Sequence, residues 1–270
     1  AIYRICRKGG AGTTDPLGNK IDWKNGSHRY LASLLADERP RIRDRARETL
    51  VNRGTKSEKA LVSFLSGNKN PEARARAIWT LSRTGGKAAL AALRTALNDN
   101  HAGVSQAAAR SLGELKDKAA VKSLCLVVTN GTPGARRTAA ESLGKIGDPG
   151  SIPALLESIE TSSDDYLDHA LCYALIDIGD AGETLAGLKS RSSLVRRLSL
   201  IALNRMGAEL SIDQVLPLLD TNDPALKRAA PEIAAGHPSW AKNIASLIDG
   251  WLKAKAPDAS HLTMLRGSIK

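Results

Sequence analysis

One predicted helix past the middle of the chain holds the densest group of reactive side chains. Asp165 and His169 are four residues apart, as are Asp168 and Cys172, so each pair lies on one helix face. Such a set could hold a metal ion. Alternatively, Asp164 or Asp165 caps the helix N-terminus, His169 pairs loosely with Asp165, and Cys172 fills a small core position. We favour this structural interpretation and therefore expect no metal and no other cofactor.

Other catalytic patterns are absent from the sequence. The Gly-rich segment GGAGTTD at residues 9–15 lacks the Lys-Ser/Thr pair of a phosphate-binding loop, and there is no HExxH or GxSxG motif. Cys6, Cys125 and Cys172 are odd in number and widely spaced, which excludes a CxxC motif and a disulfide framework. The sequence therefore predicts a protein that is not an enzyme.

A recurring frame decides which elements position these residues. An Arg is followed by an Ala three residues later, a Leu four further on and a Gly four beyond that, and the frame returns after steps of 31, 31, 31, 32, 28 and 31 residues. The first column is Arg43, Arg74, Ser105, Arg136, Asp168, Arg196 and Lys227; the Ala column is Ala46, Ala77, Ala108, Ala139, Leu171, Ser199 and Ala230; the Leu column is Leu50, Leu81, Leu112, Leu143, Leu175, Leu203 and Ala234; the closing column is Gly54, Gly85, Lys116, Gly147, Gly179, Gly207 and Pro238.

This spacing predicts one helix in every copy, because offsets of three, four and seven share a helix face and Gly stops a helix. A Pro three residues before the first column, at Pro40, Pro71, Pro133 and Pro224, suits the first helical turn. A second apolar stripe lies between successive copies, so each unit is a helix pair, shortened in its first helix near residues 183–190. Such pairs bury their apolar faces only by stacking, which predicts a solenoid.

Composition agrees with this fold. Aromatic residues make up 3% of the chain and apolar residues 42%, so the core must be built from small aliphatic side chains, which suits closely packed helices. No apolar stretch is long enough to span a membrane.

The frame P-x-x-R-x-x-A-x-x-x-L-x-x-x-G, preceded by a Leu-rich helix, resembles the HEAT repeat, especially its short bacterial form associated with phycobilin lyases. The resemblance implies an all-α, right-handed α-solenoid of about seven to eight helix pairs over residues 28–256. Repeat five departs most, with Asp168 and Leu171 where Arg and Ala are usual. That departure marks a possible kink or site.

The opening residues AIYRI, followed by a loop and then LASLLADERPRIRDRARETLVNRG, are similar to a junction in large exported bacterial proteins. In those proteins a sugar-dehydrogenase-like β-propeller ends where a HEAT region begins, and a c-type haem domain often follows. The resemblance implies that residues 1–27 are a propeller strand and a linker, and that residues 257–270 are a tail or the next linker. It also implies a periplasmic or exported location, which the residues themselves do not determine.

Two sets of residues are assigned roles. The ladder of Arg43, Arg74, Arg136, Arg196 and Lys227 is predicted to be structural and to bond loop carbonyl oxygens or acids of a neighbouring repeat. HEAT arrays line their concave side with the second helix of each pair, where the fifth position after the ladder is occupied by Glu48, Trp79, Arg110, Glu141, Tyr173, Ile201 and Glu232. The predicted partner-binding residues are Arg45, Arg47, Arg76, Trp79, Arg110 and Tyr173, although Trp79 could equally lie in the core.

The distribution of charge narrows the class of partner. The net charge is +11, and residues 1–100 hold 20 Lys and Arg against 9 Asp and Glu, whereas residues 101–180 hold 7 against 11. A basic N-terminal third suits an anionic partner, but the acidic stretch interrupts a continuous track for phosphates. We therefore expect a monomeric, non-catalytic scaffold that binds protein. The alternatives are nucleic-acid binding of the DNA-glycosylase type and an enzyme such as a bilin lyase.

Overall fold

The computed structural model describes residues 14–219, 221 and 223–253, and every regular element within that part is helical. No described helix has the length and apolar character needed to cross a membrane. The α-helices are α1 (His28–Ser33), α2 (Pro40–Asn52), α3 (Glu58–Gly67), α4 (Pro71–Thr84), α5 (Lys87–Ala96), α6 (Ala102–Glu114), α7 (Val121–Asn130), α8 (Pro133–Ile146), α9 (Ile152–Glu160), α10 (Asp165–Ile178), α11 (Ala181–Thr184), α12 (Ser193–Met206), α13 (Ile212–Leu219), α14 (Leu226–Ala235) and α15 (Ala241–Lys253). Short 3₁₀ turns are η1 (Leu34–Ala36), η2 (Gly54–Ser57), η3 (Lys118–Ala120), η4 (Pro149–Ser151), η5 (Leu185–Lys189) and η6 (Pro238–Trp240).

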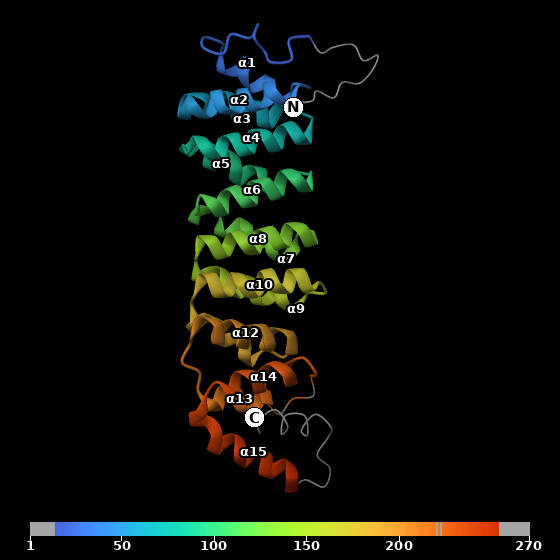
Figure 1. Cartoon of the computed structure of the whole chain (residues 1–270), viewed down its shortest axis with the longest axis vertical. Coiled ribbons are helices and arrows are strands. Elements are labelled where there is room, and N and C mark those ends of the chain that lie inside the picture. The colour runs from blue at the N-terminus through green and yellow to red at the C-terminus, as the bar shows by residue number, and fades with distance from the viewer. Residues whose placement is uncertain (1–13, 220, 222, 254–270) are drawn as a thin grey trace, which may run out of the picture. The chain divides into compact units, whose positions relative to one another are not determined.

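The chain forms two compact units, residues 1–111 and 112–270, and the boundary falls inside α6. In the first unit α1, α3 and α5 pack in succession, and α2 packs along α4 (Figure 1). In the second unit α8, α10, α12 and α14 form one layer, and α7 packs on α9 in the other. Each unit is therefore a stack of helix pairs, as the all-α solenoid prediction requires. The repeat frame continues through the boundary, so the sequence carries no sign of it.

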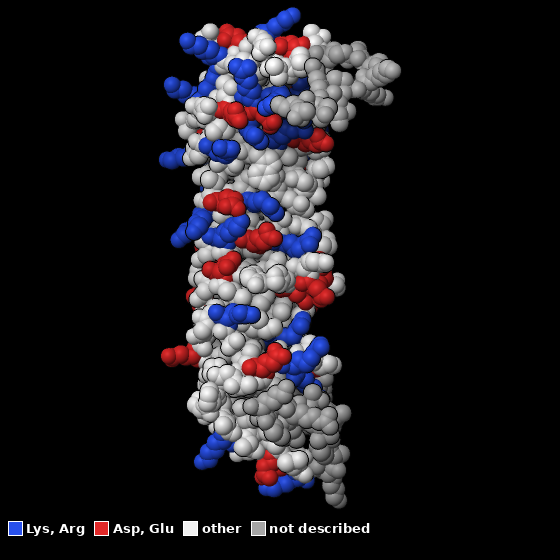
Figure 2. Space-filling view, viewed as in Figure 1, with Lys and Arg blue, Asp and Glu red and all other residues white. Residues whose placement is uncertain are grey.

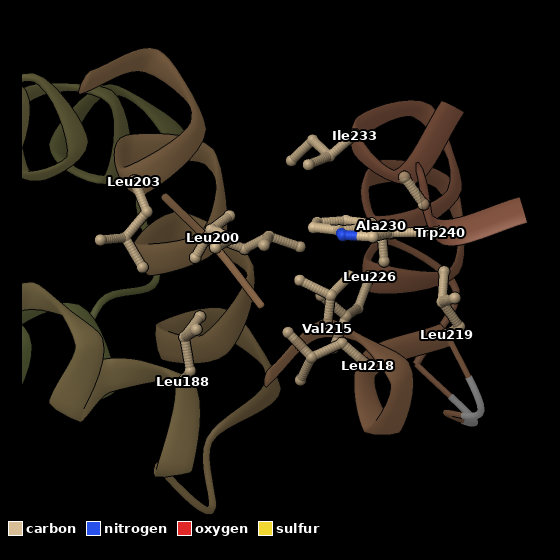
Figure 3. Close-up of a cluster of buried hydrophobic side chains, with 12 residues drawn as sticks. Leu188, Leu200, Leu203, Val215, Leu218, Leu219, Leu226, Ala230, Ile233 and Trp240 are labelled. Carbon is tan, nitrogen blue, oxygen red and sulfur yellow. The ribbon is translucent and has the colours of Figure 1, made fainter. Parts of the chain in front are cut away.

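The predicted core columns are confirmed. Every residue of the Ala and Leu columns is buried, with none more than 2% exposed. The expected shortening of the first helix in repeat six is also present, as α11 and η5. Later repeats keep the same principle: Leu200 and Leu203 of α12 join Val215 of α13 and Leu226 of α14 in one apolar cluster (Figure 3). Aliphatic residues thus form most of this interior, and Trp240 is an aromatic member of the cluster.

Helix boundaries follow the predicted signals except in repeat seven. Pro40, Pro71 and Pro133 each begin a helix. The prediction for Pro224 is wrong, because Pro224 lies in a turn and α14 begins two residues later, at Leu226. Asp223 Oδ1 accepts a hydrogen bond from the backbone N–H of Leu226 (2.7 Å) across this turn. The closing column also fails in this repeat, since α14 ends before Pro238, which instead begins η6.

Lys116 takes the place of the closing glycine after α6 and adopts a positive φ of 50°. A non-glycine residue is destabilised by about 1–2 kcal/mol in this conformation because of its Cβ. Replacement by glycine removes this strain, but glycine loses more conformational entropy on folding, so the net gain is smaller. We expect Lys116→Gly to raise the free energy of unfolding by up to about 1 kcal/mol, measured by urea denaturation. Glu157→Gly, at an exposed position within α9, should lower it by about 1 kcal/mol. Equal losses in the two variants would contradict the expectation.

The described part of the predicted linker is bound to the first helices. Arg53 donates to the carbonyl oxygens of Gly26 (2.7 Å), Lys24 (3.0 Å) and Trp23 (3.1 Å), and Arg39 donates to that of Asp15 (2.8 Å). Residues 14–27 therefore cover α2. The predicted propeller strand at residues 1–5 and the predicted tail at residues 257–270 lie outside the described residues.

Candidate binding surfaces

Four ladder arginines donate to main-chain carbonyl oxygens, and three of them, Arg43, Arg74 and Arg196, bond the loop that precedes their own helix. Arg43 bonds those of Asp37 and Glu38 (both 2.9 Å), and Arg196 bonds those of Ser190 (2.8 Å) and Arg191 (2.9 Å). Arg43 and Arg196 thus hold the loop of their own repeat. Lys227 occupies the ladder position on α14.

Two ladder arginines also reach the following repeat. Arg74 bonds the loop carbonyls of Asn68 and Lys69 (both 3.1 Å) and grips the Asp99 carboxylate from Nε (2.9 Å) and Nη2 (2.8 Å). Burial is the largest single influence on Asp99 and opposes its ionisation, but the Arg74 hydrogen bonds, the backbone N–H of His101 and the nearby positive charges together hold the pKa of this carboxyl below its ordinary value. Arg136 bonds Val128 O (2.9 Å) and, in the next pair, Ser158 O (2.7 Å).

The fifth position after the ladder forms an exposed column on the second helices. Six of its seven members are exposed, and only Ile201 is half-buried. Trp79 on α4 is 38% exposed and Tyr173 on α10 is 53% exposed, so Trp79 lies at the surface rather than in the core. Arg110 on α6 is exposed as well. Large aromatic and Arg side chains at a surface are the types enriched at binding hot spots.

The three other predicted partner-binding arginines differ in their exposure and in the contacts that their guanidinium groups make. Arg45 is exposed and stacks its guanidinium 4.7 Å from the ring centroid of Trp23. Arg47 forms a 3.5 Å ion pair with Asp44 one turn away. Arg76 is half-buried, donating to Leu35 O (3.1 Å) and Glu72 Oε2 (2.8 Å). Arg76 therefore ties α4 to η1, and Arg45 is the arginine of the three that presents its charge most openly.

A groove of about 650 Å³ lies between α10 and α12 in the second unit. It brings together Asp168, one of the two departing residues of repeat five, and two arginines of repeat six. Its lining is Asp165, Asp168, His169, Cys172, Tyr173, Ile176, Arg197, Leu198, Ile201 and Arg205. The rings of His169 and Tyr173 are in contact, with centroids 4.5 Å apart. Among the described residues no group of three or more His, Cys, Asp or Glu side chains could hold a metal ion. Asp164, as expected, caps α10 by accepting from the Tyr166 N–H (2.9 Å).

The sequence profile of HEAT repeats matches residues 29–113 and 95–176, more than half of the chain. The chain belongs to the HEAT-repeat family. The sequence has no significant match among curated protein sequences.

Three solved structures are similar to this chain at low identity. The CpcE–CpcF complex of phycocyanin lyase from Nostoc sp. PCC7120 is 16% identical with a TM-score of 0.47, covering 100% of this chain and 98% of that one. YibA of Escherichia coli is 18% identical with a TM-score of 0.48, covering 97% and 99%. Human deoxyhypusine hydroxylase is 19% identical with a TM-score of 0.38, covering 82% and 90%.

The HEAT array encloses Cys172 and leaves Cys125 half-buried. Burial raises the pKa of the Cys172 thiol to about 11, and burial together with Asp148 raises that of Cys125. The thiolate is the reactive form, so we expect Cys172 to resist iodoacetamide at pH 8 in the folded protein and to react once urea unfolds it. Peptide mass spectrometry measures both states. Rapid labelling of Cys172 in the folded protein would contradict this expectation.

The frame of the HEAT repeat did not reveal every contributor to these surfaces. Arg197 and Arg205 join the groove although they lie off the ladder, and Trp23 supports Arg45 from a segment outside the repeats. Arg197 directly follows the ladder residue Arg196. Repeat five carries the acidic Asp168 at its ladder position, where most repeats carry a basic residue. This change of charge is the sequence signal that could have suggested a basic neighbour such as Arg197 from the next repeat.

Proposed function

We propose that this HEAT region is a non-catalytic scaffold that binds a protein partner through the exposed face of its second helices. The exposure of Trp79 carries the proposal: a large aromatic ring kept 38% exposed on α4 is expensive in water and useful in an interface. Arg45 on α2, which packs along α4, adds an exposed charge to this unit. In the second unit Tyr173 offers a comparable exposed anchor.

The charge of the first unit favours an acidic partner. Figure 2 shows Lys and Arg side chains gathered over the region of α1, α2 and α4, interspersed with acids. Mixed charge of this kind suits a protein surface, where opposite patches steer association and set register. The partner is either a neighbouring domain of a larger polypeptide or a separate acidic protein.

The larger polypeptide is proposed to be an exported bacterial protein with a β-propeller before this region and a c-type haem domain after it. The similarity of AIYRI and the following residues to such a junction supports this context. The flanking coding sequence tests it directly: a propeller upstream and a CxxCH motif downstream are expected. Unrelated flanking domains would refute the context and leave the scaffold proposal standing.

We expect the double change Trp79→Ser and Arg45→Glu to abolish one specific association of the chain, because it removes the central aromatic anchor and reverses an exposed charge. Quantitative affinity purification from the source cells, compared with wild type, measures the loss. Leu126→Ser is the matched control, since Leu126 is 62% exposed on the first-helix layer. The proposal fails if the double variant retains every wild-type association, with its helical content unchanged by circular dichroism.

Duplex DNA separates the scaffold proposal from the nucleic-acid alternative. We expect no binding tighter than about micromolar at roughly 0.15 M salt, because acidic repeats interrupt a phosphate track. Titration at several salt concentrations by fluorescence anisotropy measures it. Tighter binding, with log K falling against log salt at a slope steeper than about −4, would instead indicate several phosphate contacts and would favour the nucleic-acid alternative.

A further inference from the structure

The groove between α10 and α12 holds a carboxylate whose hydrogen-bonding needs are unmet. Asp168 is 8% exposed, and it occupies the ladder position that five of the other six repeats fill with a basic residue. The Oδ1 atom of Asp168 is buried and has no hydrogen-bond partner among the described residues. Its Oδ2 lies 3.9 Å from Nη2 of Arg197, which is too far for a hydrogen bond.

A buried carboxylate without a hydrogen-bond donor lowers the stability of the fold unless a donor binds to it. Buried polar groups in folded proteins are almost always hydrogen-bonded, and a buried carboxylate without donors is among the most expensive exceptions. The two oxygens of Asp168 exchange by rotation about the Cβ–Cγ bond, so a donor that enters the groove can reach either. A ligand that completes this arrangement would therefore donate a hydrogen bond to Asp168.

The neighbouring arginine restricts the chemistry of that group further. Arg197 sets a fixed positive charge beside Asp168 and requires an acceptor, while Asp165 and Arg205 add one charge of each sign to the lining. A cationic ligand would face the two arginines and an anionic ligand the two aspartates. An extended residue satisfies both demands without net charge, because its N–H and its own C=O point to the same side, so the N–H can donate to Asp168 while the C=O accepts from Arg197.

The rest of the groove fits an apolar side chain beside that amide. Cys172, Leu198 and Ile201 form an aliphatic lining, and the paired rings of His169 and Tyr173 border it. A volume of about 650 Å³ lies within the range of sites that hold small ligands or a few residues, and an apolar lining with a few convergent polar groups is typical of them.

We propose that this groove binds an extended, apolar segment of a protein partner by hydrogen-bonding the main-chain N–H and C=O of one of its residues to Asp168 and Arg197. The inference rests on the proposed interaction function and specifies its second contact point, separate from Trp79. Tyr173, already assigned to partner binding, then acts by covering the bound segment.

A short peptide tests this site without knowledge of the partner. The probe is N-acetyl-Leu-Leu-N-methylamide, titrated up to about 10 mM into the full ¹⁵N-labelled chain and followed by NMR. We expect saturable shift changes in residues of α10 and α12. The same peptide methylated on every amide nitrogen keeps its carbonyls and side chains but lacks donors, and it should bind at least about tenfold more weakly.

Two variants complete the experiment. Asp168→Leu should remove binding of the probe and raise the thermal midpoint, because it replaces a buried unbonded carboxylate with an apolar side chain. Asp177→Asn is the matched control on α10; its side chain is exposed and does not line the groove, so binding should be unchanged.

Absence of saturable shifts, or equal binding of the two peptides, would overturn the proposal even if Asp168→Leu failed to fold. Undiminished binding to a folded Asp168→Leu protein would overturn it too. None of these results depends on Trp79, so the association lost in the Trp79 variant remains a separate test of the scaffold function.

Discussion

Replacing Leu143 with Ala is expected to lower the free energy of unfolding of the second unit by about 2–5 kcal/mol. Leu143 is fully buried on α8, a helix that packs against both α7 and α10. The substitution removes three carbons from a closely packed interior and leaves a cavity that rigid neighbouring helices fill only partly. Urea unfolding of the full chain, followed by circular dichroism, measures the loss.

The same substitution should also reduce cooperativity. Each repeat of a solenoid is stabilised mainly by its neighbours, so a weak central repeat uncouples those on either side of it. We therefore expect a broadened or divided transition. Leu126→Ala, at an exposed position on α7, should change stability by no more than about 0.5 kcal/mol. One sharp transition with the wild-type midpoint for Leu143→Ala would refute the assigned core.

The core could be predicted from the sequence because helical repetition makes burial periodic. Ala46, Ala77 and Ala139 recur at one interval and all are fully buried. Five of the closing glycines adopt a positive φ, between 60° and 76°, where glycine lacks the strain of a Cβ. Lys116 adopts the same conformation without that advantage, so the backbone geometry of the repeat overrides local preference there.

The candidate surfaces were less predictable because they depend on pairs of residues from different repeats. The reversal of charge at Asp168 was visible, but its 3.9 Å separation from Arg197 and its unbonded oxygen are properties of packing. Likewise, the tie between Arg76 and Leu35 O joins segments 41 residues apart. Exposure of Trp79 follows from its neighbours on other helices, which a single-helix pattern does not specify.

Arg136 is expected to contribute more to the free energy of unfolding than its neighbour Arg137. Its Nη2 donates to Ser158 O (2.7 Å), Ser158 Oγ (2.9 Å) and Thr161 Oγ1 (2.8 Å), while its Nε donates to Val128 O (2.9 Å). The guanidinium thereby joins the C-terminal ends of α7 and α9 in consecutive helix pairs. Arg136→Gln should cost about 1–3 kcal/mol, since hydrogen bonds from a charged donor are lost and carbonyl oxygens lose partners.

Arg137→Gln is the matched control, with the same chemical change one residue along α8. Arg137 is also half-buried, and its guanidinium lies 5.9 Å from the ring centroid of Tyr166, a contact worth about 0.5 kcal/mol at an exposed aromatic ring. Arg136→Lys should restore little of the loss, because an ammonium group cannot reproduce the planar fork that reaches both helix ends. Equal stabilities of the two glutamine variants in urea unfolding would show that the ladder position carries no special structural role, and full recovery by lysine would show that charge alone accounts for it.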